Sequence, residues 1–295
     1  MSTVKSYAVG NGDMFYVNHN SDNFTIIDCN LNDESFDIIL NEIKLNCDSK
    51  GVVRFISTHP DEDHLRGLKS LDAELSLQNF YCVKNLTTKA DESDDFKHYC
   101  SLRDSSKAFH IEKGCSRRWM NRPDDERAAS GIEILWPDPS NVDFLLALEE
   151  AEAGGSPNNT SAVVTYNLQN GPTFMWFGDL ETDYMEAIAD EVVWPKVHVM
   201  FAAHHGRNSG KVPHVILDKT NPDIIVIGEA PSRHINYYGG YDTLKQNTAG
   251  DITFECRGDK VHIFVSGEAY YAPRLSWLPQ FAYLHNDAYI GSLIV

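Results

Sequence analysis

The chain has 295 residues, of which 42% are hydrophobic, 11% aromatic and 23% charged, as in folded globular proteins and unlike disordered ones. Its formal net charge of -18 repels phosphate backbones at long range, which argues against a protein that coats nucleic acid. A nuclease is compatible with this charge, because bound divalent cations reverse the local sign at their site. The length accommodates either one large domain or two small ones.

The cysteines and the N-terminus indicate where the protein resides. The six cysteines form no Cys-x-x-Cys pair, so a zinc ribbon or a dithiol redox site is not expected, and we interpret them as reduced, mostly buried residues. The first residues lack an apolar run long enough for a signal peptide, and no later stretch approaches a membrane span. We therefore expect a cytoplasmic protein that does not bind membranes.

Strands and helices alternate in the first part of the chain. The predicted elements are residues 4–17 (two short strands around a turn at 10–13), 24–28 (strand), 35–45 (helix), 52–57 (strand), 65–75 (helix) and 80–83 (strand). Residues 87–127 follow, a polar stretch with interleaved acids and bases. Mixed charge of this kind is typical of a solvated face, so we predict a polar helical insertion; a substrate arm around Arg117, Arg118 and Trp119 is the alternative.

The second part is rich in strands. The predicted elements are residues 131–136 (strand), 143–151 (helix), 162–166 and 173–177 (strands), 183–188 (helix), and 197–203, 223–227, 251–255 and 261–265 (strands). The aromatic and apolar tail, residues 270–295, is expected to dock on the body of the protein. Because no internal repeat or linker is present, residues 1–295 are interpreted as one domain.

Four potential metal ligands lie within six residues, directly after the predicted strand 52–57: His59, Asp61, Asp63 and His64. Histidine and carboxylate ligands suit zinc, manganese or iron, and the absence of a nearby thiolate indicates an open, water-bearing site. A solvated polar loop is the alternative, but four ligands together favour metal binding. Asp28, Asp179 and the pair His204–His205 also follow predicted strands, so all of these residues could meet at one rim of a sheet sandwich.

The motif His59-x-Asp61-x-Asp63-His64 resembles the His-x-His-x-Asp-His signature of the metallo-β-lactamase fold, with Asp61 in place of the second histidine. Within that superfamily the chain is similar to the hydrolase domain of the bacterial competence (DNA-uptake) channel protein. The matching stretches, in the family's order, are residues 9–13, 59–67, 158–161, 177–181 and 204–209. The resemblance implies an α/β (α+β) fold, an αββα sandwich of two mixed sheets flanked by helices.

The resemblance also implies two divalent metal ions, with zinc expected first and manganese or magnesium as alternatives. His59 and Asp61 would hold the first ion, Asp63 and His64 the second, and Asp179 would bridge both. His205 is preferred over His204 as the remaining ligand, and Asp28 would orient the ligand loop. The family's third histidine for the first ion falls near Asn159, where only amide oxygens are available, so oxygen-rich ligation makes manganese or magnesium better suited there.

The function that follows is a metal-dependent hydrolase, a phosphodiesterase or nuclease using a metal-bridging hydroxide, with Asp63 and Asp179 as catalytic residues. The residues expected to contact a nucleic acid or another phosphodiester are Asn159, Arg207, Asn208, Ser209 and His234. Two alternatives stay open: hydrolysis of a lactone, thioester or amide, and a regulatory module with a degraded metal site that acts with protein partners in a defence or uptake system. The tyrosines at 237, 238 and 241 are expected to pack rather than to stack on bases.

Overall fold

The computed structural model describes residues 1–32, 35–229, 237–268, 274–282 and 286–295. Among these residues, nine strands form a larger sheet in the order β15-β14-β13-β1-β2-β3-β4-β5-β6, and six form a smaller sheet in the order β12-β11-β10-β9-β8-β7. Both sheets are mixed, with parallel and antiparallel neighbours. The predicted αββα sandwich of two mixed sheets flanked by helices is confirmed.

The strands of the larger sheet are β1 (Ser2–Ser6), β2 (Phe15–Asn18), β3 (Asn23–Ile27), β4 (Val52–Ser57), β5 (Asn79–Cys82), β6 (Ala108–His110), β13 (Ile252–Arg257), β14 (Lys260–Val265) and β15 (Ala288–Ile294). Those of the smaller sheet are β7 (Ile132–Trp136), β8 (Val163–Asn167), β9 (Thr173–Trp176), β10 (Val199–Phe201), β11 (Ile224–Ile227) and β12 (Asp242–Lys245). The helices are α1 (Phe36–Cys47), α2 (Leu68–Leu75), α3 (Asp94–Arg103), α4 (Val142–Glu152), α5 (Thr182–Ala187), α6 (His214–Thr220) and α7 (Gln246–Ala249).

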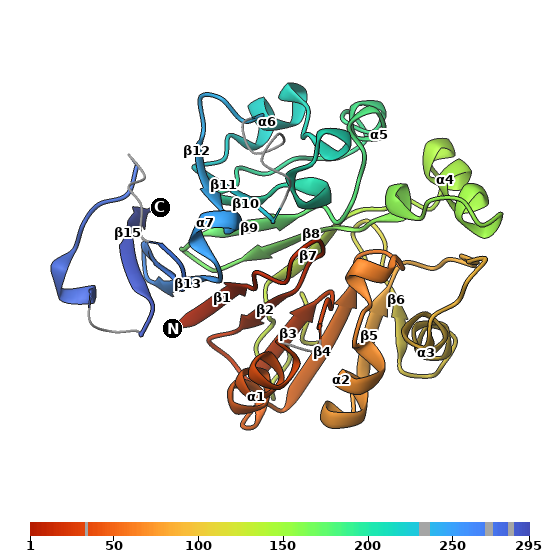
Figure 1. Cartoon of the computed structure of the whole chain (residues 1–295), viewed down its shortest axis with the longest axis horizontal. Helices are drawn as coiled ribbons and strands as arrows, with labels where there is room; N and C mark the ends of the chain where they lie inside the picture. Colours follow the sequence, from red (N-terminus) through yellow and green to blue (C-terminus); the bar gives the residue numbers. More distant parts are fainter. Residues whose placement is uncertain (33–34, 230–236, 269–273, 283–285) are drawn as a thin grey trace.

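The helices cover the outer faces of the two sheets. Figure 1 shows α1, α2 and α3 against the larger sheet and α5 and α6 against the smaller one. Along β4, Ile56 belongs to the core between the sheets, whereas Phe55 belongs to the core beneath the helices and stacks on Phe80 at 5.6 Å. Because such strands are buried on both faces, their sequences are rich in apolar residues, interrupted in β4 only by Arg54 and Ser57, and this makes them recognisable in the sequence.

The direction of the strands decides where the polar loops meet. β3, β4 and β5 are parallel neighbours in the larger sheet, and β9, β10 and β11 are parallel neighbours in the smaller sheet. Loops that follow parallel strands leave from the same edge of a sheet. The residues after β3, β4, β9 and β10 therefore come together at one rim of the sandwich.

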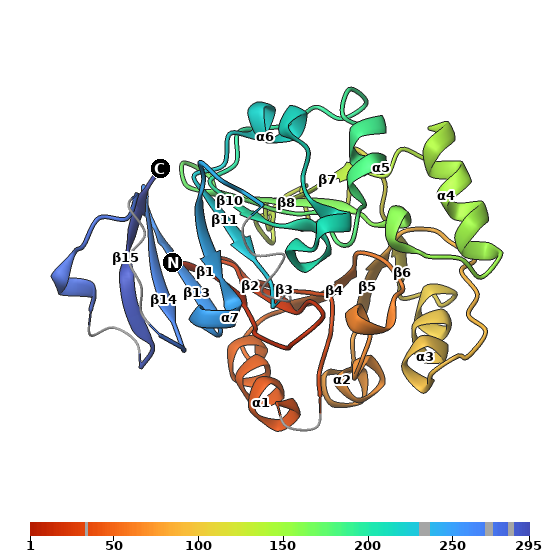
Figure 2. The same ribbon diagram turned by 45° about the horizontal axis from the view of Figure 1, so that its top comes forward.

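Two expectations about the less regular segments have different outcomes. The stretch 87–127 is only partly helical: α3 covers Asp94–Arg103, and β6 then extends the larger sheet by pairing in parallel with β5. Mixed charge hid this edge strand, because a strand with one neighbour needs few apolar residues. The tail is docked as expected, since β15 pairs antiparallel with β14 at the opposite edge of the sheet, beside β13 and the N-terminus (Figure 2). Among the described residues, every helix is too short or too polar to cross a bilayer.

Candidate metal centre

The loop after β4 is shaped by its own carboxylates. Asp61 accepts a hydrogen bond from the Glu62 backbone N–H at 2.9 Å and so begins a short 3-10 turn over Glu62–His64. Asp28, directly after β3, accepts hydrogen bonds from the Thr58 backbone N–H at 2.8 Å, from the Thr58 hydroxyl at 2.7 Å and from His64 Nδ1 at 2.9 Å. The Asp28 carboxylate thereby fixes both ends of the loop and leaves His64 Nε2 free to face the site.

The second sheet supplies Asp179 and His205. Asp179 follows β9, and Gly178 before it has a φ of +55° and no space for a Cβ, which would lie within 3 Å of side chains of Ser161 and Thr58. This close approach brings β9 against the ligand loop. After β10, both His204 and His205 have left-handed backbone conformations, an uncommon geometry for histidine that places their side chains differently.

These elements bring four candidate ligands into one group. One ligand atom each from Asp13, His64, Asp179 and His205 lies within 4.8 Å of the others. His64 Nε2 is 3.0 Å from Asp179 Oδ1, and His205 Nε2 is 3.5 Å from Asp179 Oδ2 and 3.4 Å from Asp63 Oδ2. His64, Asp179 and His205, three of the ligands predicted from the sequence, therefore meet at one rim of the sandwich as predicted. Asp63 lies at the margin of this group.

The ligand atoms of this group are suited to binding a cation. The Nε2 atoms of His64, His205 and His59 are buried and lie 3.0 to 4.0 Å from the Asp179 carboxylate, yet among the described residues neither these atoms nor Asp179 Oδ1 form a well-aligned hydrogen bond. Buried polar atoms without partners are costly in folded proteins. Imidazole nitrogens and carboxylate oxygens that face one another in this way are the donor set that zinc, manganese or iron takes. We therefore conclude that the site could hold a divalent metal ion.

The charges in the group favour deprotonated carboxylates. Burial opposes ionisation of Asp179, but His64 and His205 outweigh it and hold the pKa of Asp179 well below its usual value. Burial likewise opposes ionisation of Asp63, whose pKa is lowered to about 2, chiefly by its contact with His205. The pKa of His59, by contrast, is lowered to about 3 by burial and by the neighbouring His64. Burial opposes protonation of His64 and His205, but the carboxylates of Asp179, Asp28 and Asp13 outweigh it and raise the pKa of both imidazoles well above the usual value. At neutral pH and without a metal ion the group therefore holds two carboxylates, a neutral His59 and two protonated imidazoles, which must release their protons when a metal ion binds.

Asp13 is the member of the group that the sequence did not reveal. Its carboxylate accepts a hydrogen bond from His205 Nδ1 at 3.0 Å and so holds the ring with Nε2 toward Asp179, as Asp28 does for His64. Gly12 makes this possible, because a Cβ there would overlap Asn30 and the Asp63 carbonyl. In the sequence, Asp13 ends a glycine-rich turn and the first stretch, residues 9–13, that resembles the family, but neither signal assigned it a role at the metal centre.

The remaining predicted ligands lie at the edge of the group or outside it. His59 Nε2 is 4.0 Å from Asp179 Oδ2, and His204 Nε2 is 3.6 Å from the same oxygen while His204 Nδ1 meets the Ser209 hydroxyl at 3.1 Å. Asp61 is paired with Lys89 at 2.6 Å. Asn159 donates to the Glu181 carboxylate and accepts from the Glu181 backbone N–H. The structure thus places His205, rather than His204, in the centre.

The predicted substrate residues are distributed along the rim. Arg207 donates to Asn11 Oδ1, and Asn11 in turn donates to Asp63 Oδ2 at 3.2 Å, so Arg207 is tied to the ligand loop. A cavity of about 430 Å³ lies beside His204 and is lined by Glu181, Thr182, Asp183, Asn208, Ser209 and Lys211. His234 lies outside the described residues. Tyr238 packs as expected: it is buried, and its hydroxyl accepts from the Val212 N–H.

No family model and no curated protein matches the chain. Among solved structures it is similar to CmlA, a diiron β-hydroxylase from Streptomyces venezuelae, with 11% sequence identity and a TM-score of 0.44. That similarity covers 77% of this chain and 44% of that one, so the chain spans less than half of the other protein's length. The reaction of this protein has to be inferred from its own residues.

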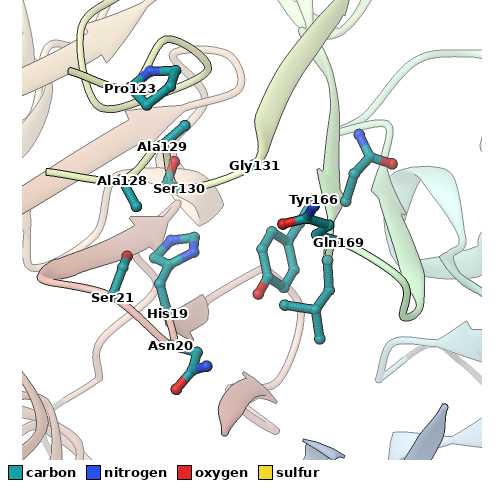
Figure 3. A pocket seen from close by; sticks show the side chains of 12 residues that line it. His19, Asn20, Ser21, Pro123, Ala128, Ala129, Ser130, Gly131, Tyr166 and Gln169 are labelled. Atoms are coloured by element: carbon teal, nitrogen blue, oxygen red, sulfur yellow. The ribbon is translucent and has the colours of Figure 1, made fainter. Parts of the chain in front are cut away.

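A second cavity, of about 500 Å³, lies at the other ends of β2 and β3, a strand's length from the metal ligands (Figure 3). Its lining residues are His19, Asn20, Ser21, Pro123, Ala128, Ala129, Ser130, Gly131, Tyr166, Asn167, Leu168 and Gln169, none of which carries a carboxylate or a thiol. His19 is buried there, with Nε2 2.8 Å from the Thr25 hydroxyl and its ring edge-on to Tyr166. This cavity offers no set of metal ligands.

His19 should make stability depend on pH. Burial, reinforced by Arg54 and Lys50, holds the pKa of His19 well below its usual value, so the folded state keeps the ring neutral. The unfolded chain takes up a proton below about pH 6.5, so the His19 contribution to stability falls by about 1.4 kcal/mol per pH unit below that point. Comparing denaturant unfolding between pH 5 and 7 should give a flatter pH profile for His19→Gln than for the unaltered chain. The exposed His214→Gln is the control, and parallel profiles for all three proteins would contradict the prediction.

Proposed function

We propose that the protein is a metal-dependent hydrolase that cleaves phosphodiesters. The observation that carries the proposal is the convergence of buried ligand atoms from separate loops of both sheets. Ser209, which contacts His204 at the same rim, also lines a cavity. A closed structural site would surround its ion with protein ligands, whereas a catalytic site keeps one side accessible to water and substrate. A bound divalent ion would polarise a phosphoryl oxygen and lower the pKa of water.

The chain's own residues would hold and orient this chemistry. His64, Asp179, His205 and Asp63 are the proposed ligands, and Asp28 and Asp13 keep the two imidazoles in the orientation that ligation requires. Asp63 has a pKa of about 2 and is therefore a carboxylate throughout the neutral range.

The donors at the rim can bind an anionic substrate, although the same cavity is also lined by the carboxylates of Glu181 and Asp183. Arg207 lies beside the ligand loop through Asn11, and Lys211 and Ser209 line the cavity that borders His204. Cations and hydroxyl donors of this kind bind the non-bridging oxygens of a phosphodiester. They matter more here than in a basic protein, because the net charge of -18 repels such a substrate elsewhere on the surface.

The test compares two substrate classes on one preparation. The metal-free protein is supplied with Mn²⁺ or Zn²⁺ and assayed with bis-(p-nitrophenyl) phosphate and single-stranded DNA, beside a panel of lactones, thioesters and amides. We expect metal-dependent cleavage of the phosphodiesters and none without metal. Activity confined to the carbonyl panel would overturn the proposed substrate class, and inactivity toward both classes with metal bound would overturn the proposal of a hydrolase.

A further inference from the structure

Lys89 occupies the side of the site where the resemblance places a first metal ion. Its Nζ lies 2.6 Å from Asp61 Oδ1 and 3.9 Å from Glu62 Oε1, and only 15% of its side chain is exposed. The ammonium also lies over the ring of Phe96, 5.2 Å from the centroid. Two carboxylates and an aromatic face therefore hold this cation in place, which distinguishes it from a mobile surface lysine.

The Asp61 carboxylate is committed to that ion pair. Its Oδ1 accepts both from Lys89 Nζ and from the Glu62 backbone N–H that begins the 3-10 turn. A divalent ion on Asp61 would stand within a few ångströms of the ammonium, and like charges so close repel strongly in a partly buried site. Lys89 thus neutralises the one carboxylate that could attract an ion to this position.

The other side of the same position is also filled. Asn159 Oδ1 accepts from the Glu181 N–H at 3.1 Å, and Asn159 Nδ2 donates to Glu181 Oε2 at 3.2 Å, so the amide is part of a closed pair. Of the three residues that would bind a first ion, His59 and Asp61 retain a ligand atom, but the remaining oxygen of Asp61 belongs to the carboxylate that the Lys89 ammonium already neutralises. One imidazole does not hold a divalent ion by itself.

We infer that the site binds a single divalent ion, through His64, Asp179, His205 and Asp63. The Lys89 ammonium, paired with Asp61, takes the place of the other ion, which the resemblance puts at His59 and Asp61. This inference rests on the proposed metal site but not on the substrate class. The protein itself supplies the positive charge that an ion at His59 and Asp61 would bring. The centre would therefore contain one metal ion and one ammonium group.

The test counts ions rather than activity. The full chain is dialysed against excess Mn²⁺, and bound metal is measured by mass spectrometry and by electron paramagnetic resonance. We expect about one ion per chain, with the spectrum of an isolated Mn²⁺. Two ions with the spectrum of an exchange-coupled pair would overturn the inference. Less than half an ion would overturn it together with the metal site itself, while leaving the fold untouched.

Variants of Lys89 test its role directly. Lys89→Met should raise the count from about one ion toward two, because Asp61 is released, whereas Lys89→Arg should stay at one because the positive charge is kept. Lys69→Met, which breaks an exposed ion pair with Asp94, is the matched control and should also stay at one. Retention of the ion at His64, Asp179, His205 and Asp63 shows that each variant is folded. A Lys89→Met protein that still binds only one ion would show that Lys89 is not what excludes an ion from the position at His59 and Asp61.

Discussion

Replacing Asp179 by Asn is expected to abolish metal binding and to lower hydrolysis by more than about 100-fold. Asp179 is 1% exposed and lies between 3.0 and 4.0 Å from His64, His205, His204 and His59, so every candidate histidine ligand on the rim faces its carboxylate. Loss of this charge removes a ligand while preserving shape. A bound ion stabilises the transition state by several kcal/mol, and each loss of about 1.4 kcal/mol lowers the rate about tenfold, so loss of the ion accounts for a decrease of more than about 100-fold.

The control for Asp179→Asn is another aspartate in an ion pair. Asp190 pairs with Lys219 at 2.7 Å on the surface, where 93% of the Asp190 side chain is exposed. Asp190→Asn should leave both metal content and hydrolysis unchanged, because exposed ion pairs contribute little. Should Asp179→Asn bind as much metal as the unaltered chain, Asp179 would not be a ligand and the proposed centre would be wrong.

Metal binding should also stabilise the fold by a measurable amount. The candidate ligands come from loops of both sheets, so an ion on His64 and His205 links the two layers and has no equivalent site in the unfolded chain. At free metal 100-fold above the dissociation constant, the free energy of unfolding should rise by about 2.7 kcal/mol. For a chain of this size that corresponds to an increase in melting temperature of roughly 5 °C.

This stabilisation is measured by thermal unfolding of the metal-free protein with increasing Mn²⁺ or Zn²⁺. Asp179→Asn serves as the control, because its melting temperature should not respond to the same additions. Sodium chloride at equal ionic strength separates a specific site from general screening of the net charge of -18. Unfolding curves that coincide with and without metal would contradict an ion held between the two sheets.

The fold was accessible from the sequence because its signals are local. The strands β3, β4, β9 and β10 are rich in apolar residues because both of their faces are buried, although Thr25 and Arg54 interrupt β3 and β4. Each strand is followed by a polar ligand residue or loop. Parallel strands then send those loops to one edge, so the meeting of His64, Asp179 and His205 could be expected without coordinates. The edge strand β6 was missed, because its alternation is short and its neighbours are charged.

Which of His204 and His205 belongs to the metal centre could be decided only from the backbone conformation. Both residues have positive φ, which no pattern in the sequence predicts for histidine. The resulting turn buries His205 between Asp13 and Asp179, whereas His204 keeps 12% of its side chain exposed and contacts Ser209. Adjacent residues of the same type thus have different surroundings, decided by the main chain.

The sequence alone determined most of the strands and helices and the identity of most candidate ligands, because apolar periodicity and the spacing of the 59–64 loop are properties of short segments. The αββα architecture was expected from the resemblance of its motifs to the metallo-β-lactamase fold. Only the tertiary structure revealed Asp13, which lies 192 residues from the His205 that it orients, and Lys89, which lies 28 residues from the Asp61 that it neutralises. Such contacts depend on how two sheets and their loops pack, and no local pattern encodes them. The number of ions that this centre holds is therefore a property of the packing, even though most of its ligands are visible in the sequence.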